Sequence, residues 1–257
     1  PSHLHRAPAL EALAAGCHVY CEAPLASTIE DGRAIVEAAR QSDRVFVTGM
    51  LGRVNPIYNL AYKFWRTGSI SDAATLNAQY HKKTSLRTPV RAGQDERALN
   101  WRLDPEVSLG LAGEFGTHQF DVFHWFLGEY PSAVSGRGRI ALHDDGREMP
   151  DTEQVTLEFP SGMVLDYSST LANSYNNDFE LLAGTMGSIK LAWSWGWLFK
   201  EADAPTQGWE VYANRQQFHN EEGITLIADA TKLAAQDKLK EGVGLPEPPL
   251  YSGVENF

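Results

Sequence analysis

One stretch, residues 110–127, constrains the fold of this chain more than any other. It contains four polar or amphipathic residues at spacings of 4, 3 and 4, namely Glu114, His118, Asp121 and Trp125. On a helix, these spacings place all four side chains on one stripe. The positions between them are mainly aromatic or aliphatic, and Gly116 lies in the first turn, where a missing Cβ lets a substrate or another backbone approach closely. The sequence therefore predicts a largely buried helix that carries one polar stripe.

The first two residues of the stripe have the spacing of an acid/base pair. Glu114 can orient the imidazole of His118, and the imidazole can move a proton near neutral pH. The same spacing fits a histidine that packs in a core and bonds to its neighbours, because perturbed polar groups are often structural. Spacing alone leaves both interpretations open. A metal site would need a third ligand such as Asp121 or His124, and we predict no metal centre.

Two segments resemble motifs of the Gfo/Idh/MocA oxidoreductases, the family of glucose–fructose oxidoreductase and the inositol dehydrogenases. The stretch around His118 resembles the family's Asp/Glu-x-Gly-x-His-x-x-Asp helix, and residues 18–25 (His-Val-Tyr-Cys-Glu-Ala-Pro-Leu) resemble its His-Val-x-x-Glu-Lys-Pro motif. The motifs occur in the expected order, and the resemblance extends over nearly all of the chain. It implies an NAD(P)-dependent enzyme acting on a sugar, polyol or related carbohydrate, with His118 as the catalytic acid/base and Glu114 in the family's usual Asp position.

The fold class expected is α/β plus α+β. Residues 1–54 are predicted to be the C-terminal part of a Rossmann-like dinucleotide-binding domain, and residues 55–257 an α/β substrate-binding and oligomerisation domain. The second domain is expected to be an open, mostly antiparallel sheet with the site helix packed on one face. Strands are predicted at 18–21, 44–49, 73–80, 132–142, 153–159, 163–171, 179–183, 188–192 and 209–212, helices at 6–15, 28–41, 55–65 and 223–235, and a linker or tail beyond 242.

The cofactor side is predicted at the carboxyl end of the first strand, where α/β sheets place their ligands. By resemblance, Glu22 and Pro24 border the nicotinamide of NAD or NADP, and His5 is a further candidate contact. The Ala23–Pro24 bond is a candidate cis peptide. No Gly-x-Gly-x-x-Gly occurs in the sequence, so we interpret the chain as lacking its first βαβ units, either as a fragment or as a trimmed relative. The choice between NAD and NADP stays open.

The family's motif lysine is Ala23 in this chain. The lysine would donate to the reacting hydroxyl and bias the proton transfer electrostatically, and alanine can do neither. Three interpretations stay open. Another cation (Lys82, Lys83 or Arg53) enters the site; or the chemistry is NAD-assisted glycoside hydrolysis or elimination on the same fold; or catalysis is lost and the chain is a non-catalytic carbohydrate-binding remnant.

The residues predicted to bind substrate are Arg53, Tyr80, Lys82, Trp101, Arg102 and Asp121. Arg53 resembles the family's arginine after the second strand, although a surface arginine paired with an acid fits equally well. The long loop 81–100 would deliver Tyr80, Lys82 and the Trp-Arg pair towards the site helix. Aromatic rings and guanidinium groups suit the apolar face and the hydroxyls of a sugar. Core packing is an equal alternative for Trp101.

Composition restricts the partners. A net charge of −11 argues against nucleic acid, and no apolar run reaches the ~18–20 residues of a membrane span. Two cysteines suggest a reducing, cytoplasmic compartment, although a missing N-terminus could hide an export signal. Trp193, Trp195 and Trp197 alternate and fit either core packing or a subunit contact. In the family the second sheet face commonly forms such a contact, so we expect a homo-oligomer that binds a small carbohydrate.

Overall fold

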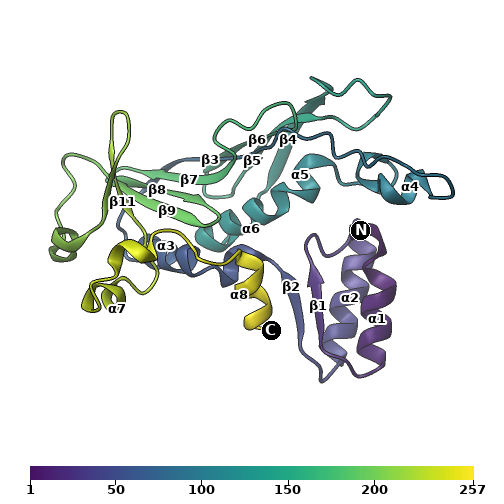
Figure 1. Cartoon of the computed structure of the whole chain (residues 1–257), viewed down its shortest axis with the longest axis horizontal. Coiled ribbons are helices and arrows are strands. Elements are labelled where there is room, and N and C mark those ends of the chain that lie inside the picture. Colours follow the sequence, from purple (N-terminus) through teal and green to yellow (C-terminus); the bar gives the residue numbers. More distant parts are fainter.

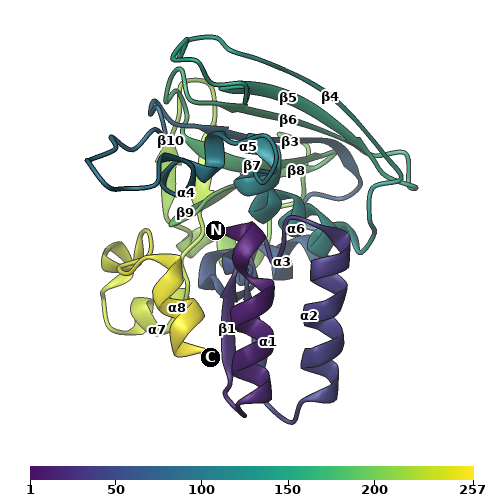
Figure 2. The ribbon, with the colours of Figure 1, turned by 90° about the vertical axis from the view of Figure 1, so that its right-hand side faces the viewer.

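The computed structural model describes residues 1–257 as two sheets with helices packed between and beside them (Figure 1). The first sheet contains two parallel strands, β1 (Val19–Glu22) and β2 (Phe46–Gly49). Helices α1 (Arg6–Ala14) and α2 (Ile29–Gln41) run side by side against it (Figure 2). The predicted helix start at Thr28 is confirmed, because the Thr28 hydroxyl accepts a hydrogen bond from the Asp31 N–H and caps α2. The segment therefore has the helix–strand alternation of a Rossmann-like unit.

The second sheet has nine strands and is mostly antiparallel. Its strand order is β10-β11-β9-β8-β7-β3-β6-β5-β4, and only the β3–β6 pair is parallel. The strands are β3 (Ala73–His81), β4 (Ala133–Arg139), β5 (Thr152–Glu158), β6 (Val164–Thr170), β7 (Asp178–Gly184), β8 (Gly187–Ala192), β9 (Trp195–Lys200), β10 (Arg215–Gln217) and β11 (Glu222–Thr225). The predicted open, mostly antiparallel sheet is confirmed.

Helices cover one face of this sheet and leave the other open (Figures 1 and 2). The helices beyond the first unit are α3 (Pro56–Arg66), α4 (Glu96–Leu99), α5 (Gly110–Glu114), α6 (Gly116–Leu127), α7 (Ala230–Ala235) and α8 (Pro249–Glu255). Along each strand, side chains alternate between the face that the helices cover and the open face. In β6, Leu165 and Tyr167 are buried under the helices, while Asp166 between them is exposed. A core of 19 buried residues joins α3 and α6 to the sheet.

Two capping residues fix the helices that form this core. The Asn55 side chain accepts hydrogen bonds from the backbone N–H groups of Ile57 and Tyr58, with Pro56 in the first position of α3. Gly128 ends α6 in the left-handed conformation, which suits glycine. Between these ends, Gln119 donates to the backbone oxygens of Gln79 and Phe179 and so ties α6 to two neighbouring strands.

Two predicted elements are wrong. Residues 209–212 are not a strand, because Gly208–Tyr212 is a 3₁₀ helix whose capping box is formed by Gln207 and Glu210. Residues 223–235 are not one helix. Gly223–Thr225 instead extend the sheet against β9, and Asp229 in a left-handed conformation separates them from the short helix α7. Ile224 and Thr225 are β-branched and favour a strand, and here they pair with the edge of β9 although the sequence has a helical periodicity.

The segment beyond Gly242 is more ordered than the predicted tail. It contains α8, which lies beside the first sheet in both views (Figures 1 and 2). A Cβ at Gly253 of α8 would lie 3.1 Å from Leu51 and 3.2 Å from the Tyr20 hydroxyl, so the helix approaches the end of that sheet closely. Among the helices of the chain, none combines the length and the apolar character needed to cross a membrane.

Candidate functional site

The predicted site helix is interrupted at Phe115, between α5 and α6. The Phe115 ring stacks on Tyr80 of β3 with ring centroids 4.5 Å apart. Gly116 then begins α6 in a space where a Cβ would lie 2.8 Å from the Phe120 ring and 2.9 Å from that of Tyr167. The close approach predicted at Gly116 therefore exists, but aromatic side chains occupy it.

The interruption separates Glu114 from His118. Glu114 is buried, and its Oε1 accepts hydrogen bonds from the Ser2 hydroxyl at 2.8 Å and from the Leu109 N–H at 3.2 Å. No hydrogen bond joins it to His118, whose Nδ1 is buried and has no partner. In this structure Glu114 therefore holds the N-terminal segment against α5, and the expected orienting contact with His118 is not formed.

His118 lies in the first turns of α6 beneath an aromatic ring. The Trp193 ring meets it edge-on with centroids 5.8 Å apart. Burial lowers the pKa of His118 below its ordinary value, and the nearby charge of Asp121 opposes part of that shift. The imidazole is therefore neutral near pH 7, and its Nδ1 has no hydrogen-bond partner.

The predicted substrate residues Arg53 and Asp121 are joined directly. The Arg53 guanidinium donates two hydrogen bonds of 2.8 Å to the two carboxylate oxygens of Asp121, and it lies 5.8 Å from the centre of the Trp125 ring. This bidentate bond raises the pKa of Arg53 further above its ordinary value. Because Asp121 is one turn after His118, the Arg53–Asp121 ion pair places hydrogen-bond donors and acceptors of fixed orientation next to the imidazole.

A row of stacked groups brings the other predicted substrate residues together. The Arg102 guanidinium lies 4.4 Å from the Trp101 ring centre and 6.0 Å from that of Phe115, which in turn stacks on Tyr80. Trp101 is buried and also contacts His3 at a centroid distance of 5.6 Å. Trp101 is therefore packed, as the core-packing interpretation predicts, and its ring supports the exposed Arg102. Its contact with a sugar stays a prediction.

Asp178 at the start of β7 was missed by the sequence reasoning. Burial raises its pKa, while contacts with the Trp193 side chain and the charge of Lys82 oppose the rise. Its strand position pairs it with Tyr80. The only available signal was its place directly after the polar turn 173–177. Lys82 itself is exposed and near this carboxyl, so it is a cation on the side of the site where Trp193 lies.

The predicted cofactor residues lie together at the carboxyl end of β1. Pro24 is buried after a cis Ala23–Pro24 bond, as expected, and the His5 Nδ1 lies 3.3 Å from the Leu25 carbonyl oxygen. Glu22 is exposed, and a Cβ at Gly49 would lie 2.4 Å from its carboxylate oxygen. The Tyr20 hydroxyl beside it is buried without a partner, which fits a polar group of a nicotinamide. No glycine-rich turn that could cradle a pyrophosphate is present.

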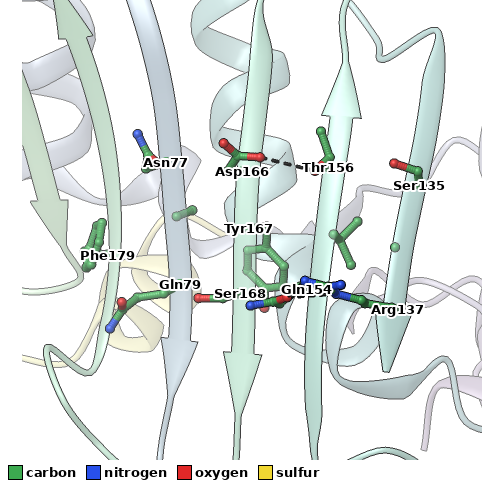
Figure 3. A pocket seen from close by; sticks show the side chains of 13 residues that line it. Asn77, Gln79, Ser135, Arg137, Gln154, Thr156, Asp166, Tyr167, Ser168 and Phe179 are labelled. Atoms are coloured by element: carbon green, nitrogen blue, oxygen red, sulfur yellow. Dashed lines mark hydrogen bonds between the residues drawn. The ribbon is translucent and has the colours of Figure 1, made fainter. Parts of the chain in front are cut away.

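Two hollows lie on different sides of the large sheet. One of about 520 Å³ is lined by Leu51, Trp193, Ser194 and residues 245–250, so it adjoins the ring that covers His118. The other, of about 650 Å³, lies on the open face and is lined by polar side chains that include Gln79, Arg137 and Ser168 (Figure 3). Only the first is close to the histidine. No cluster of three or more His, Cys, Asp or Glu side chains is placed to hold a metal.

Two family models match this chain. The model described as "Oxidoreductase family, C-terminal alpha/beta domain" matches residues 78–219, and "Oxidoreductase family, NAD-binding Rossmann fold" matches residues 1–50. The first match alone covers more than half of the chain, and the second coincides with the segment of β1 and β2.

Curated relatives and a solved structure agree with these matches. The 2,7-anhydro-N-acetylneuraminate hydratase of Escherichia coli K12 is 29% identical over 199 residues, which is 74% of this chain and 49% of that protein. The levoglucosan dehydrogenase of Pseudarthrobacter phenanthrenivorans is 30% identical over 136 residues, covering 52% of this chain and 33% of that protein. A structure titled "Levoglucosan dehydrogenase, complex with NADH and levoglucosan" shares the fold with a TM-score of 0.67 at 23% identity, covering 88% of this chain and 58% of that one. The chain therefore spans at most about half the length of these two curated relatives.

Proposed function

Because the chain belongs to the Gfo/Idh/MocA oxidoreductase family, we propose that it takes part in NAD(P)-dependent oxidation or reduction of a sugar, polyol or related carbohydrate, with His118 as the acid/base. The observation that carries the proposal is the half-buried imidazole of His118, whose pKa is lowered by burial, one turn from the Arg53–Asp121 pair. Relatives named as sugar and polyol dehydrogenases or reductases support the substrate class.

The side chains around His118 divide the work of proton transfer and binding. A neutral imidazole accepts a proton from a substrate hydroxyl, and the carboxylate of Asp121 stabilises the imidazolium that results. The Arg53 guanidinium and the Asp121 carboxylate retain free donors and lone pairs for neighbouring hydroxyls. Glu114, which bonds to Ser2, keeps the N-terminal segment against the site rather than orienting the imidazole.

Aromatic groups provide the wall against which a sugar ring packs. The Trp193 ring lies against His118, and Tyr80, Phe115 and Arg102 form a row of stacked groups at the helix interruption. Rings of this kind suit the apolar face of a pyranose, and Arg102 and Lys82 supply donors for its oxygens.

The cofactor contacts are proposed at the first sheet. We place the nicotinamide next to Glu22 and Pro24, with His5 holding the following loop through Leu25. When bound, a nicotinamide accepts or supplies the hydride. We propose residues 1–54 as the dinucleotide-binding part and residues 55–257 as the substrate-binding part, because the strands after α3 form the large sheet, although α8 returns to pack beside the first sheet.

A second candidate function is NAD-assisted hydrolysis or elimination on the same scaffold. The observation that favours it is Ala23 in the position of the motif lysine, which removes a donor to the reacting hydroxyl. A relative named as a hydratase of an anhydro sugar fits the same idea. Elimination still needs an acid/base, so His118 would keep its role.

Binding of NADH to the 257-residue chain tests the proposal. We expect micromolar binding by calorimetry, weakened at least several-fold by a Pro24→Ala variant and unchanged by Glu158→Gln on the exposed side of β5. In a protein that binds NADH, NAD-dependent oxidation of free sugars supports the first function, whereas NAD-dependent cleavage of an aryl glycoside supports the second. Absence of binding to the 257-residue chain would overturn cofactor binding by this chain alone.

The open face of the large sheet is proposed as the contact with a second copy. It carries no helix in either view, and it includes the polar hollow of Figure 3. Trp195 and Trp197, stacked at 6.1 Å on β9, add aromatic surface near its other end. Sedimentation analysis should give a dimer or larger, and Gln154→Arg in the polar hollow of this face should shift it towards monomer. A monomeric wild-type chain at micromolar concentration contradicts this assignment.

A further inference from the structure

Trp193, whose indole ring lies against His118, has a backbone conformation that tryptophan rarely adopts. Strand β8 ends just before it and β9 begins just after Ser194, so these two residues alone form the turn between the strands. The φ of Trp193 is 45°, in the left-handed region where a residue with a Cβ is strained. Two-residue hairpin turns usually place glycine or asparagine where φ is positive. The chain therefore carries a bulky aromatic residue at a position that suits a much smaller one.

A strained backbone persists only where the surrounding structure holds it. At Trp193, two side chains from the start of α3 provide the hold. The Asn55 Nδ2 donates to the Trp193 carbonyl oxygen at 2.7 Å, and the Trp193 N–H donates to the Tyr58 hydroxyl at 3.1 Å. Both backbone polar groups of this one residue are therefore bonded to α3.

Asn55 and Tyr58 are themselves fixed in place, and both are buried. The Asn55 Oδ1 accepts from the N–H groups of Ile57 and Tyr58 at the start of α3, so the two ends of its amide are distinguished by their partners. The Tyr58 hydroxyl donates its hydrogen to Glu180 Oε2 at 2.7 Å, which leaves its lone pairs to accept from Trp193. The two side chains thus connect the start of α3 firmly to the turn.

The same turn meets the imidazole, the hollow beside it and the C-terminal segment. The indole ring centre lies 5.8 Å from that of His118 and 6.3 Å from that of Tyr58. Trp193 also lines the hollow of about 520 Å³, and the Leu245 N–H of the opposite wall donates to the Ser194 carbonyl oxygen at 2.9 Å. The position of the turn therefore determines what lies next to the imidazole on this side.

We propose that Asn55 and Tyr58 are positioning residues that hold Trp193 in its left-handed conformation. Held in this way, the indole lies against His118 and keeps water from one side of the imidazole. Ordinary core packing does not require tryptophan in a two-residue turn, so the strain indicates that the ring is needed where it lies. The inference rests on the proposed function only in that His118 is the group whose surroundings matter.

The test removes each bond separately in the 257-residue chain. Tyr58→Phe lacks only the hydroxyl, and Asn55→Ser keeps an oxygen that can cap α3 but loses the amide donor. Tyr212→Phe is the control, because this tyrosine is 80% exposed. The first measurement is the nuclear Overhauser effect between the indole of Trp193 and the imidazole of His118, with both signals assigned by substitution. Tyr58→Phe and Asn55→Ser should each at least halve its intensity, and the control should leave it unchanged.

The second measurement is the pKa of His118 by NMR titration. In the wild type it should lie below the ordinary 6.5 because the ring is buried, with the charge of Asp121 opposing part of the shift. In Tyr58→Phe and Asn55→Ser it should move towards 6.5, because a displaced indole lets water reach the imidazole.

Two outcomes overturn the inference: a folded Asn55→Ser with an unchanged Overhauser effect, or one with an unchanged His118 pKa. Folding is judged by circular dichroism. If Tyr58→Phe does not fold, Asn55→Ser decides alone. Neither readout uses turnover or NADH, so an inactive His118 would overturn the proposed function and leave this inference standing. Conversely, an active His118 with an unmoved indole would overturn this inference alone.

Discussion

Replacement of His118 by alanine is expected to lower kcat by ~10²–10⁴ in an enzyme form that binds NADH and turns over a sugar, because the variant lacks the group that takes the hydroxyl proton. The reason lies in the geometry around one ring. The imidazole is half-buried beside Trp193 and its pKa is lowered by burial, so the neutral base is already present near pH 7. Oxidation should fall only as the pH drops below the lowered pKa of this histidine.

A matched histidine on the same helix provides the control. The His124 Nδ1 lies 3.0 Å from the Glu129 carbonyl oxygen, and its ring stacks on the exposed Tyr130 at 3.8 Å. His124→Ala should therefore change kcat by no more than a few-fold. Steady-state rates at saturating NAD(P) and sugar, measured from pH 5 to 9, decide the matter. Equal losses in the two variants, or a loss below a few-fold at His118, would remove the acid/base assignment.

Features encoded by neighbouring residues could be predicted from the sequence. Thr28 and Asn55 cap their helices with their own side chains, and the alternation in β5 and β6 is visible within a few residues. The order of the two sheets followed from the same local patterns together with the family resemblance. These predictions needed no knowledge of which distant segments meet.

Features that depend on distant partners could not be predicted. Glu114 has the spacing of a partner for His118, yet its hydroxyl donor is Ser2, 112 positions away. The helix interruption at Phe115 depends on a stack with Tyr80 from another strand. The periodicity after Gly223 favoured a helix, but an unpaired edge of β9 was available to Ile224, and pairing with it satisfied the backbone.

The acidic residues near His118, Asp178 and Glu180, could not be predicted as part of the site for the same reason, because their position depends on distant partners. Asp178 and Glu180 face the site only because β7 pairs with β3 beneath α6, and Tyr58 reaches Glu180 across 122 positions. A lone acidic residue on a predicted strand indicates an exposed position more often than a buried one. The burial of Glu180 and its bond to Tyr58 could therefore be found only in the structure.

Stability is expected to depend most on the apolar side of the same helix, and Phe123→Ala tests this. Phe123 is completely buried in the core that joins α3 and α6 to the sheet. Truncation removes its transfer free energy and leaves a cavity, which together cost about 3–5 kcal/mol of the free energy of unfolding. Urea unfolding followed by circular dichroism measures the loss.

Two further variants show whether the cavity is the cause. Phe123→Leu keeps much of the buried volume and should cost clearly less than Phe123→Ala. Val134→Ala on the exposed strand β4, where Val134 is 64% accessible, should stay within about 0.5 kcal/mol of wild type. A Phe123→Ala cost near that of Val134→Ala would mean that α6 is not held by this core. His118 would then owe its position mainly to polar contacts, above all the two hydrogen bonds by which Gln119 ties α6 to β3 and β7.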